Sequence, residues 1–266
     1  MKKIMTVLLA LCLVGLNGCA KKDEVQKDLL KTIQERGEII VAMEGTWSPW
    51  TYHDENDELV GYDVEVAKLI ARELGVEAKF VEGEWDGLLG GLESGRYDIM
   101  ANGVEITEER AQKYDFSEPY GYIHTALIVH TDNDAIKSYE DLDGKTTANS
   151  ISSTYMTLAE SYGATAQGVD SLDQTFELVL NKRVDATLNA ELSYDDYMKA
   201  HPNAKLKVVA LTPEASQVSI PMRKGAETEN LRKAIDEAII KLQQSGELKA
   251  VSEKYFGKDI SGLQTK

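Results

Sequence analysis

The sequence predicts an α/β protein with two lobes. Three observations lead to this fold class: short aliphatic segments alternate with amphipathic helical segments, the alternation occurs in two series, before residue 102 and after residue 122, and two helical segments close the chain. Such alternation is typical of mainly parallel sheets with helices on their faces. The 266 residues are enough to form a core in each lobe.

The first series consists of three strands and two helices. Apolar residues recur on one helical face from Val64 to Leu74, and Gly75 then supplies a common C-terminal stop. A second helical segment ends at Ser94 and Gly95. The predicted strands are 38–43, 76–81 and 98–101, and the predicted helices are 64–74 and 85–93.

The second series has four strands and leads into the closing helices. Residues 171–174 form a capping box that begins a helix, and Gly246 separates the last two helices. The predicted strands are 123–130, 146–149, 184–188 and 206–211, and the predicted helices are 153–162, one from 171, one ending near 200 and two at the C-terminus. Open α/β sheets bind ligands at the carboxyl ends of their strands, so two facing sheets predict a site in the cleft between them.

The N-terminal residues predict secretion and lipid attachment. Two lysines precede the uncharged segment 4–16, which is shorter than the roughly 20 apolar residues that span a membrane and fits a signal peptide. Residues 16–19 resemble a bacterial lipobox, whose last residue, Cys19, is acylated. We therefore expect a signal peptide over 1–18 and a lipid-anchored tether over 19–28; a plain signal peptide with a chance cysteine is the alternative.

Composition excludes several classes of function. The net charge is −16, and removal of the signal peptide would leave −18, which argues against nucleic acid or anionic lipid as partners. Cys19 would be the one cysteine of the mature chain, so neither an intramolecular disulfide nor a thiolate metal site is expected. The four histidines are scattered, and no phosphate loop, dinucleotide motif or nucleophile elbow is present. We expect no metal, no cofactor and no catalytic residues.

An ordered set of motifs resembles the bacterial extracellular solute-binding proteins of family 3, which include histidine, glutamine and cystine binders. The motifs span most of the chain: 45–50, 61–67, 85–89, 92–98, 106–110, 114–120, 141–145, 183–186 and 254–256. The segments 101–104 and 147–150 look like the cystine-binding branch of the family. No single motif is decisive, but the order in which they occur is specific.

The resemblance implies a two-lobed periplasmic-binding-protein clamshell of type II, with a mainly parallel sheet in each lobe and two hinge crossings. The crossings are expected near 119–122 and 215–219. The expected divisions are lobe 1 over 29–120 plus 217–256, lobe 2 over 121–216 and a C-terminal tail over 257–266. Hinge closure around a ligand is the expected motion.

The resemblance also implies how a ligand carboxylate is bound. Arg110 matches the family's carboxylate-binding arginine, and a guanidinium meets a planar carboxylate with two parallel hydrogen bonds. The alternative is a surface arginine paired with Glu109 or Asp115. Ser153 and Thr154 match two hydroxyl positions at a helix start, where free N–H groups attract an anion, although ordinary N-capping would use the same residues.

Two tryptophans match positions where the family packs side chains against the ligand. Trp47 and Trp85 both lie in loops before helices, where stacking on a ligand or packing beneath the loop are the two interpretations. Trp50 is predicted to lie in the core. Glu44 follows the first strand, at a position where the family sometimes contacts the distal part of the ligand, and favours a ligand with a second amine or another donor.

The residues expected to bind an α-ammonium depart from the family pattern. Asn102 and Gly103 follow a strand and could offer main-chain carbonyls. The family's ammonium-binding aspartate is replaced by Ala190, and the usual serine or threonine of the other lobe is replaced by Glu105. We expect Glu105 to supply the missing carboxylate, because a buried ammonium requires one. Alternatively, Glu191 turns inward, or the ligand lacks an α-amino group.

The resemblance implies extracytoplasmic capture of a small amino acid, best guessed as cystine or another polar amino acid, and its delivery to an ABC transporter permease. We expect a monomer that contacts the membrane through its lipid anchor alone. An enzyme resembling cyclohexadienyl dehydratase is the alternative, because the same fold occurs in that class and fold does not settle function. A receptor ligand-binding domain is a third interpretation.

Overall fold

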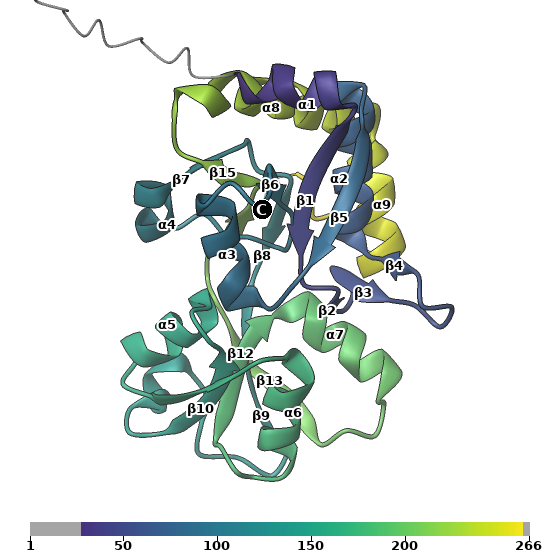
Figure 1. Ribbon diagram of the computed structural model, residues 1–266. Coiled ribbons are helices and arrows are strands. Elements are labelled where there is room, and N and C mark those ends of the chain that lie inside the picture. The colour runs from purple at the N-terminus through teal and green to yellow at the C-terminus, as the bar shows by residue number, and fades with distance from the viewer. Residues whose placement is uncertain (1–27, 263–266) are drawn as a thin grey trace, which may run out of the picture.

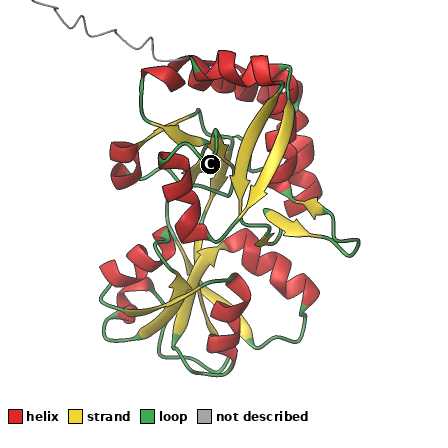
Figure 2. Ribbon diagram, viewed as in Figure 1, coloured by secondary structure: helices red, strands yellow, loops and turns green. Residues whose placement is uncertain are grey.

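The computed structural model describes residues 28–262, and the predicted signal peptide and Cys19 lie outside this range. The described chain forms two lobes, each built on its own sheet (Figure 1). Red helices flank the yellow strands of both lobes in Figure 2, and extended segments link the lobes. The predicted two-lobed α/β class is therefore confirmed.

The first lobe contains a parallel sheet of order β5-β1-β6, in which Val41 of the central strand pairs with Phe80 and Ile99. Helices cover this sheet, and a small antiparallel sheet of order β2-β3-β4 lies beside it. The strands are β1 (Glu38–Met43), β2 (Thr46–Trp47), β3 (Thr51–His53), β4 (Leu59–Val60), β5 (Glu77–Glu82) and β6 (Ile99–Met100). The helices are α1 (Leu29–Arg36), α2 (Tyr62–Leu74), α3 (Trp85–Glu93), α4 (Glu108–Lys113), α8 (Glu229–Ser245) and α9 (Glu247–Phe256).

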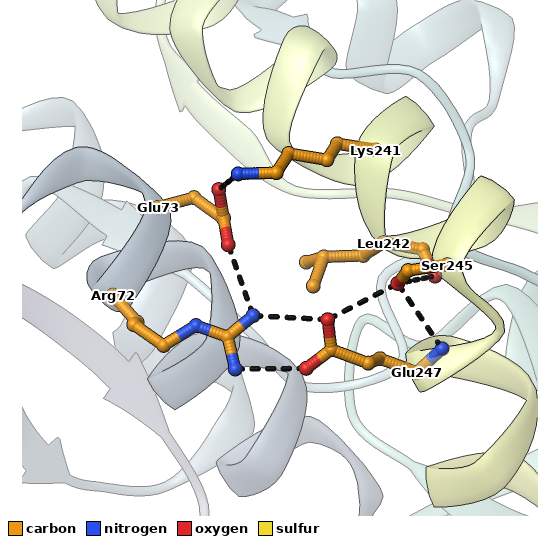
Figure 3. A network of polar contacts seen from close by, with 6 residues as sticks. All are labelled: Arg72, Glu73, Lys241, Leu242, Ser245 and Glu247. Carbon is orange, nitrogen blue, oxygen red and sulfur yellow. Dashed lines mark hydrogen bonds and ion pairs between the residues drawn. The ribbon is translucent and has the colours of Figure 1, made fainter.

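The C-terminal helices return to the first lobe and are joined to α2 by ion pairs. Arg72 contacts Glu247 at 2.8 and 3.1 Å and the neighbouring Glu73 at 2.9 Å, and Glu73 also pairs with Lys241 (Figure 3). Exposed pairs of this kind contribute little energy individually. The stabilisation comes from the buried apolar face of α8, which includes Leu231 and Ile239.

The second lobe is a five-stranded sheet of order β11-β10-β12-β9-β13. Strand β9 runs antiparallel to β12 and β13, so this sheet is mixed, whereas β10 pairs in parallel with β11 and β12. The strands are β9 (Thr125–His130), β10 (Thr146–Ser150), β11 (Thr165–Val169), β12 (Ala186–Ala190) and β13 (Leu206–Leu211). The helices are α5 (Thr154–Ser161), α6 (Leu172–Leu180) and α7 (Glu191–Ala200), with a 3-10 turn at Tyr139–Leu142; a second 3-10 turn, Ala226–Thr228, precedes α8 in the first lobe.

Two antiparallel strand pairs join the lobes. Strand β8 pairs with β14, and β7 pairs with β15 nearer the first lobe. These strands are β7 (Tyr114–Phe116), β8 (Gly121–Ile123), β14 (Ser216–Val218) and β15 (Pro221–Arg223). After α9 the chain returns to this hinge, where the Ile260 carbonyl accepts a hydrogen bond of 2.9 Å from the Tyr122 N–H.

The sequence prediction missed strand β11 and was wrong in the bounds of two other strands of the second series. The single strand expected over 123–130 is broken at His124, whose Nδ1 lies 2.7 Å from the Thr212 carbonyl, because β8 pairs within the hinge and β9 within the second sheet. The strand expected over 184–188 is β12, which begins two residues later. The N–H groups of Arg183 and Val184 donate to the Leu178 carbonyl and close the end of α6 instead.

Candidate functional site

A cavity lies between the two lobes, where the strands of both sheets end. The first lobe contributes eight of its lining residues: Glu44, Thr46, Trp47, Trp85, Asn102, Gly103, Glu105 and Arg110. The second lobe contributes six: Ser150, Ser153, Thr154, Tyr155, Leu172 and Asn189. The structure thus brings all but one of the predicted ligand-binding residues to one cavity. Glu191 is the exception.

Arg110 is a buried cation at the wall of this cavity. The Thr107 hydroxyl caps the short helix α4 by accepting a 3.1 Å hydrogen bond from the Arg110 N–H, which fixes the backbone from which the side chain extends. The residue is only 9% exposed, and its guanidinium lies 5.1 Å from the ring centre of Trp85. One guanidinium nitrogen donates to the Glu105 carbonyl at 3.1 Å.

The guanidinium of Arg110 forms no direct ion pair with a carboxylate of residues 28–262, although Glu105 lies near enough to act on it electrostatically. Among residues 28–262, no carboxylate oxygen lies within 4 Å of a guanidinium nitrogen of Arg110. Glu109, which was one alternative partner, pairs with Lys113 instead. Burial lowers the pKa of Arg110 from its usual value, although an arginine remains charged at physiological pH. The nearby charge of Glu105 opposes this decrease without forming a direct ion pair, so the guanidinium still has hydrogen-bond donors to offer an anion in the cavity.

Asn102 holds Glu44 at the floor of the cavity. Its amide nitrogen donates to a Glu44 carboxylate oxygen at 2.6 Å, and its amide oxygen accepts from the Glu44 N–H at 2.7 Å. Burial raises the pKa of Glu44 to about 7, and the bond from Asn102 opposes this increase. Glu44 therefore accepts a hydrogen bond when ionised and can hold a proton near neutral pH.

Gly103 allows the backbone to pass close beneath Trp47. Its φ of +56° is disfavoured for other residues, and a Cβ atom at this position would lie 2.6 Å from the Trp47 ring. The Gly103 N–H donates at 2.5 Å to Asp63, a fully buried carboxylate that also accepts from Tyr120 at 2.7 Å. Desolvation raises the pKa of Asp63 to about 7.

Trp47 and Trp85 form apolar walls with unused polar edges. Trp47 stacks on the fully buried Trp50 with ring centres 5.2 Å apart, and Trp50 lies in the core as predicted. In the described part of the chain, the indole nitrogens of Trp47 and Trp85 are buried without a hydrogen-bond partner. Such atoms are uncommon in native interiors, and at a cavity wall they are donors available to a bound molecule.

Glu105 connects the two lobes across the cavity. Its side chain is almost fully buried, with 6% of the residue exposed, and one carboxylate oxygen accepts a 2.8 Å hydrogen bond from the Thr154 hydroxyl of the second lobe. Its backbone pairs with Val218 in the hinge strand β14. Glu105 therefore lies where the cavity, the opposite lobe and the hinge meet.

The second lobe presents the start of α5 to the cavity. Ser153 is the N-cap residue, and its hydroxyl accepts from the Met156 N–H at 3.1 Å, so its side chain performs the ordinary capping role. Thr154 contacts Glu105 from the first turn. The N–H groups of this turn point toward the cavity end of the helix, where the helix dipole favours negative charge.

Glu191 requires a correction, because it does not line the cavity. It is the first residue of α7 and lies at a separate surface groove beside the hinge, where its carboxylate is 3.2 Å from the Lys258 ammonium. Lys258 belongs to the segment after α9 that returns to the hinge, so the sequence around Glu191 did not reveal this partner. The alternative in which Glu191 binds the ligand is therefore not supported.

Sequence reasoning missed five residues of the cavity wall. Their positions could have been inferred in part, because Ser150 and Asn189 lie at or near the carboxyl ends of strands and Tyr155 follows Thr154 at a helix start. Leu172 belongs to the helix predicted to begin at the capping box 171–174, and helical periodicity does not reveal that its side chain faces a cleft between lobes. The missed residues are Thr46, Ser150, Tyr155, Leu172 and Asn189.

The described part of the chain contains neither a metal-binding cluster nor a helix able to span a membrane. No group of three or more histidine, cysteine, aspartate or glutamate side chains within residues 28–262 could hold a metal ion. None of the helices in the same range has both the length and the apolarity needed to cross a membrane.

Known proteins resemble this chain over most of its length. The L-cystine-binding protein TcyA of Bacillus subtilis is 37% identical over 254 residues, which are 95% of this chain and 94% of TcyA. An L-arginine-bound substrate-binding protein of an amino acid ABC transporter from Streptococcus pneumoniae is 28% identical with a TM-score of 0.78, covering 87% of this chain and 100% of its own. The unliganded, open L-cystine receptor of Neisseria gonorrhoeae is 41% identical with a TM-score of 0.60, covering 88% and 99%.

The two solved structures differ in how well they match the arrangement of the lobes. The open receptor is the more similar in sequence but superposes less well than the arginine-bound protein, so the lobes of this chain are arranged more like those of the ligand-bound relative. The sequence model of the family described as bacterial extracellular solute-binding proteins, family 3, matches residues 39–258. The chain belongs to this family.

Proposed function

We propose that this protein binds a free amino acid with a polar or cationic side chain outside the cytoplasm and delivers it to an ABC-type importer. The observation that carries the proposal is the guanidinium of Arg110, which is 9% exposed, lines the cavity between the lobes and has no carboxylate partner in the described chain. The α-carboxylate of an amino acid supplies the missing anion with two parallel hydrogen bonds.

The remaining charges of the cavity fit the other groups of such a ligand. Glu105 binds the α-ammonium, because it is the nearly buried carboxylate closest in sequence to Arg110 and shares the same wall. One carboxylate and one guanidinium then balance the zwitterionic backbone of the ligand. Trp47 and Trp85 form the walls of the space that remains for the ligand side chain.

Glu44 is the group that selects the side chain. With Glu105 and Arg110 already matched, its carboxylate adds negative charge to the cavity floor and favours a ligand with a second cationic donor. Cystine offers a second ammonium, and arginine offers a guanidinium. This class agrees with what the relatives are named for, L-cystine and L-arginine, and cystine is our first candidate.

A thermal-shift panel tests this function on residues 20–266, which include every described helix and strand. The panel contains the twenty amino acids and cystine. A ligand that binds the folded state raises the melting temperature in proportion to RT ln(1 + [L]/Kd). We expect the largest shift with cystine, followed by arginine, and none with aspartate or glutamate. No shift with any amino acid would contradict the proposal.

The setting of the protein forms the second part of the proposal. Acylated Cys19 holds a monomer at the outer face of the cell membrane, beside the permease that receives the amino acid, and the protein performs no catalysis. Mass spectrometry of the membrane fraction tests the lipid, with Cys19→Ala as the variant that abolishes it.

Incubation with prephenate or arogenate tests the dehydratase alternative, because any elimination product above background would favour an enzyme.

A further inference from the structure

Among residues 28–262, two hydrogen bonds outside the cavity connect segment 48–50 of the first lobe to helix α7 of the second, beside the Lys258–Glu191 pair at the hinge. The Ser48 hydroxyl donates to the Asp196 carboxylate at 2.8 Å, and the Trp50 indole N–H donates to the Ser193 hydroxyl at 3.2 Å. Ser193 and Asp196 are three residues apart on α7 and therefore share one face of that helix. Figure 1 shows α7 of the second lobe next to β2 and β3 of the first.

The segment that makes these bonds is also a wall of the cavity. Trp47 lines the cavity and stacks on Trp50 with an interplanar angle of 18°. Trp50 and Ser193 are both fully buried, so their bond is shielded from water while the lobes are together. Within residues 47–50, Trp47 therefore lines the cavity, and Trp50 contacts Ser193 of the opposite lobe.

We propose that residues 47–50 act as a closure latch, in which Ser48 and Trp50 hold α7 and so set how long a bound amino acid is retained. This inference deepens the proposed function and rests on it. Parting of the lobes exposes Asp196 and Ser193 to water and breaks both bonds, so these bonds contribute to the closed state alone. Neither Ser48 nor Asp196 lines the cavity, so each affects retention without contacting the ligand.

The latch predicts a specific kinetic effect. Ser48→Ala and Asp196→Ala each remove the same bond, so each variant should release the amino acid about 3- to 10-fold faster with less than a 2-fold change in association rate. The double variant should behave like either single variant, because one bond is lost in all three. Stopped-flow tryptophan fluorescence with L-cystine and with L-arginine measures both rates.

Asp195→Ala is the matched control, because it removes the carboxylate at the adjacent position of α7, and among residues 28–262 segment 48–50 is hydrogen-bonded to Ser193 and Asp196 but not to Asp195. We expect its release rate to equal that of the unmodified protein. Release rates unchanged in Ser48→Ala and Asp196→Ala, or raised equally in Asp195→Ala, would overturn the latch.

A measurement without ligand separates the latch from the proposed function. Residues 20–266 contain no cysteine. Spin labels attached at Lys113→Cys and Glu160→Cys, one exposed site in each lobe, therefore report the interlobe distance by double electron–electron resonance spectroscopy. If neither amino acid binds, the proposed function fails for those ligands and the distance distribution alone decides the latch. We expect Asp196→Ala to reduce the population at the short distance by more than 2-fold; equal populations would refute the latch.

Discussion

The two walls of the cavity differ in kind. The first lobe contributes every charged group, Glu44, Glu105 and Arg110, together with both tryptophans. The second lobe contributes only uncharged residues, among them Ser153 and Thr154 at a helix start. Recognition of the ligand's charges can therefore be completed on one lobe, and the other adds neutral hydrogen bonds and shields the charges from water when the cleft closes.

This difference predicts an order of energetic effects. A charge-assisted hydrogen bond contributes about 1.5–3 kcal/mol, whereas a neutral one contributes about 0.5–1.5 kcal/mol. Substitutions of charged residues in the first lobe should therefore weaken binding more than substitutions of hydroxyl groups in the second. We expect the energetic effect of substitution to decrease in the order Arg110, Glu105, Glu44 and Thr154.

Arg110→Ala should have the largest effect. It removes a bidentate partner of the ligand carboxylate, and we expect a loss of about 3 kcal/mol, or on the order of 100-fold in Kd. Isothermal titration with the amino acid that gives the largest thermal shift measures this loss. A Kd within 3-fold of the original would mean that the first lobe does not hold the carboxylate.

Glu105→Gln should come next. It keeps the size of the side chain and an acceptor for the Thr154 hydroxyl but removes the negative charge, so the α-ammonium loses its counter-ion. We expect a roughly 10- to 50-fold weaker Kd in the same titration. Glu191→Gln is the control, because Glu191 lies outside the cavity and should leave the affinity unchanged.

Glu44 should make the unliganded protein less stable as the pH rises. Burial raises its pKa from 4.5 to about 7 in the folded chain, so between these values the folded state retains a proton that the unfolded state has lost. Its stabilising contribution is complete below pH 4.5, declines as the pH rises and is lost above pH 7. Asp63 acts in the same direction, because desolvation raises its pKa as well.

Urea unfolding at pH 5 and pH 8 measures this effect, with Glu44→Gln as the comparison. We expect the free energy of unfolding to fall less in the variant, by roughly 1–3 kcal/mol, while the contribution of Asp63 remains in both proteins. A cationic ligand should bind the unmodified protein more tightly at pH 8, where Glu44 is ionised. An identical pH dependence in the two proteins would show that Glu44 does not titrate in this range.

Thr154→Val should have the smallest effect. It removes the neutral hydroxyl that donates to Glu105 from the second lobe and keeps the shape of the side chain. We expect a loss of about 1 kcal/mol, or roughly 5-fold in Kd. An effect equal to that of Glu105→Gln would contradict the claim that the first lobe contributes more binding energy than the second.

Local sequence patterns predicted the bounds of those helices and strands that do not depend on pairing with distant parts of the chain. The helix expected over 85–93 and the strand expected over 206–211 agree with α3 and β13 in both bounds. The break at His124 and the antiparallel direction of β9 were missed, since both follow from pairing with strands far away in the chain. An apolar run fixes neither its neighbour nor its direction.

The candidate site shows the same division between local and distant information. Motifs of the first lobe placed Arg110 and Glu105 correctly at the cavity, because strand ends and loops of one lobe are brought together by one sheet. Ser153 and Thr154 of the second lobe were also placed at the cavity, but the contacts that residues make across the cleft were not predicted. Thr154 meets Glu105, and Lys258 draws Glu191 away, only when the lobes and the C-terminal segment have packed together.

The most direct test of the central claim compares an amino acid with its α-carboxamide in two proteins. The amide removes the ligand's negative charge, and Arg110→Ala removes the charge that should meet it. If Arg110 binds the carboxylate, the unmodified protein should prefer the acid to the amide on the order of 100-fold, and Arg110→Ala should bind the two almost equally. A variant that still prefers the acid 100-fold would place the carboxylate elsewhere and contradict the account.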